Sequence, residues 1–183
     1  MSSLPFQAQL LIDGYNIIGA WPELKRTRDR HGLESARREL IEIAIDYSAS
    51  QGYQTQIVFD AHYQKTPSSQ EKYTANLLAH YTAFAQTADS YIEKFCASHF
   101  RRYQPSSNRL IVATSDRAQQ LTVVGYGAEW LSAQKLAKDV ESTARRRKRK
   151  HRPQKQARGR FLSNSLDPKS REILSQWRHN IKS

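Results

Sequence analysis

Short hydrophobic runs alternate along the chain with longer stretches in which apolar residues recur every three or four positions. The runs predict buried strands over residues 9–12, 54–59 and 110–113, and a weaker strand over 81–84. The periodic stretches predict helices over residues 33–50, 87–100 and 132–144, and one more that begins after Ser115 as its N-cap. This order indicates an α/β fold with a mostly parallel central sheet flanked by helices.

Polar and turn-forming residues predict how these elements are connected. Residues 13–16 are expected to form a loop, because Gly14 permits a turn, and residues 62–72 are expected to form a polar loop. Residues 153–159 have the composition of a linker, and a short helix is expected to begin at Asp167.

Aspartates stand close to the places where hydrophobic runs stop or helices begin. A charged carboxylate is an unfavourable end for a buried strand, and ligands of open α/β sheets bind outside the carboxyl ends of the strands. Acids gathered at that edge repel one another unless a cation lies between them. Carboxylate oxygens are the ligands that Mg²⁺ and Mn²⁺ prefer. The sequence therefore predicts a divalent-metal site, formed by Asp13, Asp60, Asp89 and Asp116.

The charge of the chain is concentrated in one segment. The net charge is +12, and the ten Lys and Arg residues between Arg145 and Arg160, with no acid among them, account for all but +2 of it. This predicts a domain of residues 1–144 followed by a basic C-terminal helical extension, residues 145–183. Such a run can be a merely solvated surface, but its density favours RNA binding. The predicted RNA-binding residues are Arg145, Arg146, Arg147, Lys148, Arg149, Lys150 and Arg152.

Other features of the sequence exclude several classes of protein. The single cysteine, Cys96, cannot form an internal disulfide, and its amphipathic context predicts a packed core position. No run reaches the roughly 18 apolar residues of a membrane span, and the first residues lack the pattern of a signal peptide, so no membrane partner and a cytoplasmic location are expected. The histidines lack zinc-site spacing, and no phosphate-binding glycine loop is present.

The segment Leu-Ile-Asp-Gly-Tyr-Asn at residues 11–16 resembles the signature of the NYN-domain ribonucleases, a branch of the PIN-like nuclease fold. Further motifs follow in order, and together they resemble the YacP-like NYN proteins of bacteria and plastids over nearly the whole chain. These motifs are Gly-Ala-Trp-Pro (19–22), Val-Phe-Asp-Ala-His (58–62), Thr-Ala-Asp (87–89), Ile-Glu-Lys (92–94), Ala-Thr-Ser-Asp (113–116), Gly-Tyr-Gly-Ala (125–128) and a charged terminal helix with Trp177.

This resemblance implies a PIN-like three-layer fold and metal-dependent endonucleolytic cleavage of messenger RNA in association with the ribosome, in the cytoplasm or the plastid stroma. Carried over by motif, the acidic set is again the four aspartates, and Asn16 is the asparagine that positions an acid or a water. The chain departs from the family in its dense block of cations at 145–150, its longer segment at 66–78, and Gln119-Gln120 in place of an expected acid or amide pair.

The residues of the predicted site have different expected roles. Asp13, Asp89, Asp116 and Asn16 are the predicted catalytic residues, and all four aspartates are the predicted metal ligands. Asp13 follows the first strand and is expected to be the central ligand, whereas Asp60 could act by orienting a water. The simpler alternative is that Asp89 and Asp116 are favourable acids in the first turns of helices, worth about 0.3–1 kcal/mol each.

Neighbouring side chains also have two interpretations. Tyr15 and Trp21 could stack on an unpaired base. Trp21, which precedes a proline, fits the core better, and His62 fits a surface loop without a role better than a proton shuttle. The hydroxyl of Thr114 or Ser115 could bind a phosphate oxygen or a carboxylate.

Three functions compete. The leading hypothesis is a monomeric, metal-dependent endoribonuclease whose basic segment holds substrate or ribosomal RNA. The second is a non-catalytic RNA- or ribosome-binding factor that uses only the basic segment. The third, a nuclease acting on DNA flaps, is disfavoured because the chain has little room for the helical arch of such enzymes.

Overall fold

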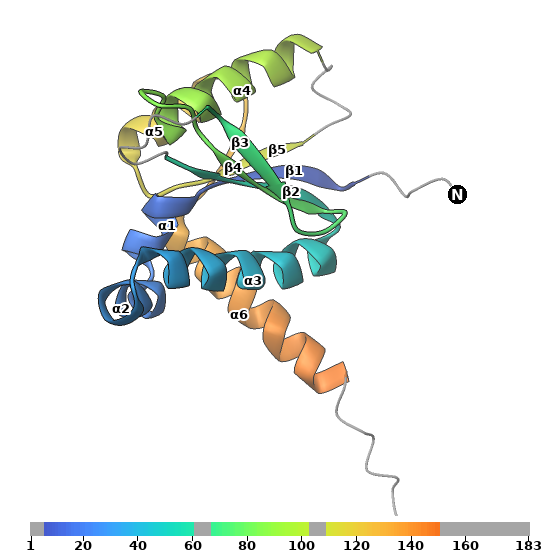
Figure 1. Ribbon diagram of the computed structural model, residues 1–183. Coiled ribbons are helices and arrows are strands. Elements are labelled where there is room, and N and C mark those ends of the chain that lie inside the picture. The colour runs from blue at the N-terminus through green and yellow to red at the C-terminus, as the bar shows by residue number, and fades with distance from the viewer. Residues whose placement is uncertain (1–5, 61–66, 103–108, 151–183) are drawn as a thin grey trace, which may run out of the picture. The chain divides into compact units, whose positions relative to one another are not determined.

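The computed structural model describes residues 6–60, 67–102 and 109–150, and within them it contains one sheet of six strands (Figure 1). The strand order is β3-β4-β2-β1-β5-β6. All neighbouring strands are parallel except β3 and β4, which are antiparallel, so the predicted mostly parallel sheet is confirmed. The strands are β1 (Ala8–Asp13), β2 (Tyr53–Phe59), β3 (Ser69–Lys72), β4 (Leu77–Tyr81), β5 (Leu110–Ala113) and β6 (Glu129–Leu131).

Helices cover both faces of this sheet, which gives the predicted three layers. They are α1 (Gly14–Ala20), α2 (Pro22–His31), α3 (Leu33–Gln51), α4 (Ala88–Arg102), α5 (Arg117–Gly125) and α6 (Ala133–Lys150). In Figure 1, α1, α2 and α3 lie on one side of the strands, and α4 and α5 on the other. Contacts within the chain divide it into residues 1–144 and 145–183, and this division falls within α6.

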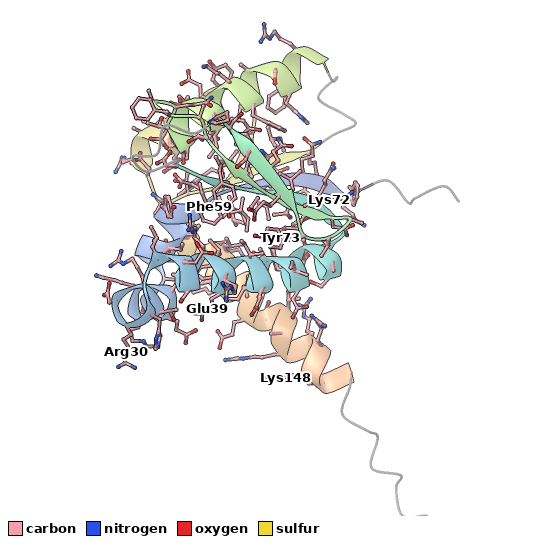
Figure 2. The ribbon with its side chains drawn as sticks, in the orientation of Figure 1. Arg30, Glu39, Phe59, Lys72, Tyr73 and Lys148 are labelled. Carbon is pink, nitrogen blue, oxygen red and sulfur yellow. The ribbon has the colours of Figure 1, made fainter. Side chains whose placement is uncertain are left out.

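Two cores form because successive side chains of a strand point to opposite faces of the sheet. Leu10 and Ile12 of β1 join the core beneath α1, α2 and α3, whereas Leu11 joins the core beneath α4 and α5. Phe59 at the end of β2 belongs to the first core and lies between the sheet and the helices (Figure 2). Cys96 of α4 is fully buried in the second core, which confirms its predicted packing role.

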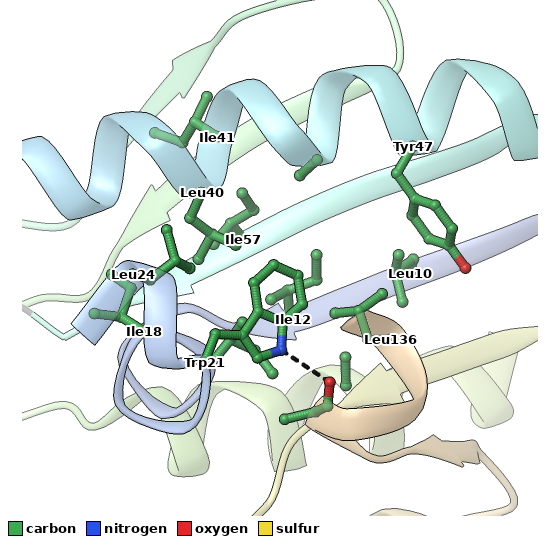
Figure 3. Packing of buried hydrophobic residues seen from close by; sticks show 14 of the residues in the cluster. Leu10, Ile12, Ile18, Trp21, Leu24, Leu40, Ile41, Tyr47, Ile57 and Leu136 are labelled. Carbon is green, nitrogen blue, oxygen red and sulfur yellow. Dashed lines mark hydrogen bonds between the residues drawn. The ribbon is translucent and has the colours of Figure 1, made fainter. Parts of the chain in front are cut away.

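Trp21 ties the first part of the chain to the start of α6. Its side chain is only 8% exposed, and its indole Nε1 donates a hydrogen bond of 2.8 Å to the carbonyl oxygen of Ala133 (Figure 3). A buried indole with its N–H satisfied is a stable core residue. Of the two interpretations of Trp21, the core position is therefore the correct one.

The structure corrects two predicted connections. The expected loop at residues 13–16 is instead the beginning of α1, because the Asp13 side chain accepts a hydrogen bond from the backbone N–H of Asn16 and so caps the helix directly after the strand. The expected loop at 62–72 contains β3 in its last four residues. This edge strand is wholly polar and exposed, so it has no hydrophobic alternation that could reveal it.

Other boundaries also differ from the prediction. The weak strand expected at 81–84 is β4, displaced toward the N-terminus, and it pairs with β2 from Leu77 to Tyr81. Two short elements were not predicted, because α2 buries only Leu24 and β6 has three largely exposed residues. The helices expected at 33–50, 87–100 and 132–144 are confirmed as α3, α4 and α6.

The remaining predicted elements, the linker at 153–159 and the helix from Asp167, lie outside the described residues. Among the described helices, none has the length and apolar character needed to cross a membrane.

Gly14 lies where the fold leaves no room for a side chain. A Cβ at this position would overlap the ring of Phe59, whereas a Cβ at Gly19 in the same helix would meet nothing within 4 Å. We expect Gly14→Ala to lower the free energy of unfolding by about 1–3 kcal/mol. Gly19→Ala is the matched control and should be neutral or stabilising by up to about 1 kcal/mol, because alanine favours helix. Urea unfolding of both variants measures the difference, and equal stabilities would contradict this packing.

Candidate active site

The predicted acids meet at the carboxyl edge of the sheet, at the point where the chain changes direction across it. From β1 the chain passes to β2 on one side, and β5 later pairs with β1 on the other side. Asp13 is the last residue of β1, Asp60 directly follows β2, and Asp116 lies three residues after β5. Asp89 lies in the first turn of α4. Such switch points are where open α/β sheets bind ligands.

Two of the acids are helix N-caps. Asp13 Oδ1 accepts from the backbone N–H of Asn16 at 3.2 Å and caps α1. Asp116 Oδ1 accepts from the backbone N–H groups of Ala118 at 2.7 Å and Gln119 at 3.0 Å and caps α5. The prediction that Ser115 caps this helix, with Asp116 in its first turn, is therefore wrong. Asp116 replaces it because its carboxylate reaches both N–H groups.

The other two acids are also held by N–H donors. Asp60 accepts a hydrogen bond from the backbone N–H of Ala88, which is the first residue of α4. Asp89 accepts a hydrogen bond from the side-chain amide of Gln119. In each of the four acids these hydrogen bonds engage one oxygen, Oδ1. The scaffold thus orients every carboxylate through one oxygen.

Asn16 connects the start of α1 with the segment that follows β5. Its side-chain Oδ1 accepts from the backbone N–H of Ser115 at 2.6 Å, while its own backbone N–H bonds Asp13. The amide oxygen that could have faced a metal or a water is thereby engaged by the protein. The geometry fits an asparagine that fixes the start of α1, next to Asp13, against the segment that carries Asp116.

The electrostatics of the site centre on Asp13. Its side chain is 7% exposed, and burial raises the pKa of its carboxyl to about 7 from an ordinary 3.8. The hydrogen bond from Asn16 lowers this pKa, while the negative charges of Asp89, Asp60 and Asp116 raise it further. The pKa of Asp89 is also raised, first by desolvation and then by Asp116 and Asp60, against the hydrogen bond from Gln119. The four acids are therefore electrostatically coupled and repel one another.

The donor set fits a hard divalent cation, although not a cage made only of protein. Within the described residues, no three Asp, Glu, His or Cys side chains are arranged to hold one ion among them. Mg²⁺ commonly keeps several waters and uses one or two carboxylates together with a substrate phosphate. Carboxylates held by one oxygen and repelling one another suit that kind of binding.

The structure also resolves the roles of the aromatic and hydroxyl neighbours. The Tyr15 ring packs on Phe59 with ring centroids 5.2 Å apart, and its hydroxyl accepts from Arg37 at 3.2 Å, which makes it part of the packing around the site. The buried Thr114 hydroxyl accepts from the backbone N–H of Asp116 at 3.1 Å, while Ser115 is exposed. Ser115 is thus the better candidate for a phosphate contact. His62 lies outside the described residues.

Gln119 is a site residue to which the sequence analysis gave no role. It is 6% exposed, its amide N–H donates to Asp89, and its Oε1 is buried with no hydrogen-bond partner among the described residues. It stands three residues after Asp116, so the helix that Asp116 caps carries Gln119 back toward the acids. Recognising Asp116 as the N-cap would have placed Gln119 in the first turn of α5 from the sequence, but not its contact with Asp89.

The predicted RNA-binding cations belong to the second unit of the chain. Residues 145–149 are exposed and helical at the end of α6. Lys150 ends this helix, and Arg152 lies outside the described residues. The structure therefore presents an exposed row of cations on a helix, in a different unit of the chain from the acidic site.

Comparison with known proteins gives one consistent result. The YacP-like NYN domain family matches residues 10–179 of the chain. YacP of Bacillus subtilis (strain 168) is 36% identical over 142 residues, which cover 77% of this chain and 79% of that protein. A crystal structure of Rae1 (YacP) from Bacillus subtilis has a TM-score of 0.65 and 31% identity, over 96% of this chain and 92% of that one. A crystal structure of a Rae1 mutant matches with the same TM-score, over 92% of this chain and 98% of that one. These matches confirm the resemblance inferred from the motifs.

The raised pKa of Asp13 predicts how stability depends on pH. Between about pH 3.8 and pH 7 the folded protein holds a proton on Asp13 that the unfolded chain releases. The contribution of this proton to the free energy of unfolding is therefore complete below pH 3.8 and is lost as the pH rises through 7. An asparagine in its place would be neutral throughout and caps a helix as well as aspartate does. In EDTA we expect Asp13→Asn to be more stable than wild type by roughly 2–4 kcal/mol at pH 8, with the difference vanishing near pH 4.

Urea unfolding at both pH values measures this difference. Asp29→Asn is the matched control, because Asp29 is exposed on α2 and bonds to the adjacent Arg28 at the surface; its stability should follow wild type. A stability gain in Asp13→Asn that is the same at both pH values would contradict the buried charge as its cause.

Proposed function

Because this chain belongs to the YacP-like NYN domain family, a nuclease-type group, we propose that it is a metal-dependent endoribonuclease that cleaves single-stranded RNA. The observation that supports this most directly is the set of four coupled carboxylates around the switch point of the sheet. A binding protein gains nothing from burying Asp13 next to three other acids, since their repulsion only destabilises it.

The acids have distinct proposed roles in hydrolysis. Asp13, the most buried of them, would be the central ligand for Mg²⁺ or Mn²⁺, and Asp89 and Asp116 would hold the cation with it, directly or through water. When bound, the cation stabilises the additional negative charge on phosphorus and activates the attacking water. Asp60, which is fixed to the start of α4, orients a water. Asn16 holds the start of α1, next to Asp13, against the segment that carries Asp116.

The protein also supplies contacts to the RNA backbone. The exposed Ser115 hydroxyl stands next to Asp116 and can donate to a phosphate oxygen. The cations at 145–150 and Arg152 bind phosphates farther along the substrate RNA, or bind ribosomal RNA, because a dense positive helix attracts a polyanion. We propose that the enzyme acts as a monomer on messenger RNA at the ribosome, in the cytoplasm or the plastid stroma.

The exposed cations at the end of α6 also support a second candidate, a non-catalytic RNA- or ribosome-binding factor. That function would depend on the basic segment and not on Asp13. The two candidates are therefore separated by mutation.

Asp13→Asn is expected to lower cleavage of a labelled single-stranded RNA by at least about 100-fold, because the central carboxylate is lost. RNA affinity should stay close to that of wild type. Cleavage is measured with Mg²⁺, Mn²⁺ or EDTA, with and without translating ribosomes, and Asp29→Asn should cut normally. Tight RNA binding without cutting in any of these conditions would favour the binding factor, and undiminished cutting by Asp13→Asn would overturn the assigned site.

Neutralising the basic segment tests the other half of the proposal. Replacing the six cations at 145–150 by Gln should reduce the slope of log affinity against log salt concentration by about 4. The reason is that each phosphate contact on single-stranded RNA contributes roughly 0.7 to this slope. The matched control replaces Lys25, Arg26 and Arg30 of α2 by Gln and should leave the slope almost unchanged. RNA affinity titrated at several salt concentrations gives the slope, and an unaltered slope in the 145–150 variant would rule out electrostatic docking by this segment.

A further inference from the structure

A hollow of about 340 Å³ adjoins the acidic edge of the sheet. Its wall includes Ser115, the residue directly before Asp116, and Arg117, the first residue of α5. Other lining residues come from β6 and the beginning of α6, among them Trp130 and Gln134. This volume falls within the range of small-molecule sites, roughly 300–1,000 Å³. The hollow therefore lies beside the proposed catalytic acids without containing them.

Trp130 gives this hollow an aromatic surface of fixed orientation. Its indole Nε1 donates a hydrogen bond of 2.9 Å to the carbonyl oxygen of Thr114, two residues before Asp116, yet the side chain is 39% exposed. Leu121 of α5, also in the wall, is 67% exposed. An indole that is held in place but left partly uncovered loses little entropy when a flat ring stacks on it.

The remaining wall is polar and carries one positive charge. Gln120 and Gln134 offer side-chain amides, and Ser132 offers a hydroxyl. Amide groups can pair with the donor and acceptor edge of a nucleobase. Arg117 is exposed and can meet a phosphate, whereas the neighbouring acids cannot. An aromatic platform, hydrogen-bonding amides and one guanidinium match the chemistry of a nucleotide better than that of an apolar peptide.

On the premise of the proposed function, we propose that this hollow binds one unpaired nucleobase of the RNA, next to the phosphate that is cleaved. Stacking on Trp130 holds the base, and the linking phosphate then lies toward Ser115 and the acids. Because a stacked base must be free of its partner, the hollow would select single-stranded RNA over duplex.

The test measures RNA affinity in the Asp13→Asn background, so that binding is read without cleavage. A short labelled single-stranded RNA is compared with versions in which one base at a time is removed to leave an abasic sugar. Removal of the base at one particular position should weaken binding by about tenfold. Trp130→Ala should cause the same loss with intact RNA and should abolish the sensitivity to that abasic position, whereas Trp130→Phe keeps most of the affinity.

Matched variants exclude a general loss of folding or charge. Leu121→Glu places a negative charge on the exposed wall and should weaken binding as Trp130→Ala does, whereas Val124→Glu on the same helix, 50% exposed and outside the hollow, should not. Tyr73→Ala, which removes an exposed aromatic residue directly after β3, should bind like the background protein (Figure 2).

The outcomes separate this inference from the nuclease proposal. Abasic sensitivity that persists in Trp130→Ala, or equal weakening by Leu121→Glu and Val124→Glu, would overturn the base site even if the wild type cleaves RNA. Position-specific sensitivity that depends on Trp130, in a protein that never cleaves, would keep the base site and reject the nuclease. Absence of any RNA binding would reject both.

Discussion

Asp13 is a carboxylate buried at the end of β1, one of the two middle strands of the sheet, and the surrounding structure is arranged around its charge. The chain turns into α1 immediately after it, so that an N–H of the first turn meets one carboxylate oxygen. This sharp turn brings Gly14 against Phe59, where any larger residue overlaps the ring. Packing, helix capping and charge placement are therefore coupled at this one position.

Hydrogen bonds from N–H groups, as at Asp13, also hold the three other acids that lie nearby. Each of these acids accepts a hydrogen bond from an N–H group of a helix. The donor to Asp89 is the neutral amide of Gln119, which, unlike a lysine or arginine, leaves the negative charge of Asp89 in place. Such support fixes the carboxylates but leaves their repulsion in place, and this repulsion adds to burial, the larger cause, in raising the pKa of Asp13. In the proposed mechanism these acids would hold a divalent cation, and its positive charge would relieve their repulsion. The neighbouring hollow with Trp130 would then set where the RNA lies.

The sequence predicted the parts of this structure that depend on hydrophobic pattern. The strands at 9–12, 54–59 and 110–113 and the helix at 33–50 are confirmed, since burial of a whole face leaves a clear period. Elements with little burial, β3, β6 and α2, could not be seen. The gathering of the aspartates could be predicted because parallel strands end at one edge of the sheet. The groups that donate hydrogen bonds to these aspartates could not be predicted. Asn16 and Gln119 act through contacts with Ser115 and Asp89, 99 and 30 residues away, which no local pattern records.

The most direct test of the central claim is the effect of Mn²⁺ on thermal unfolding at pH 7.5, measured for wild type and Asp13→Asn. If the acids form a cation site with Asp13 at its centre, Mn²⁺ stabilises the folded protein by mass action, and removing the central charge removes most of this effect. The account predicts a concentration-dependent rise in Tm for wild type and a much smaller rise for Asp13→Asn. Equal shifts in both proteins, or no shift in wild type, would contradict it.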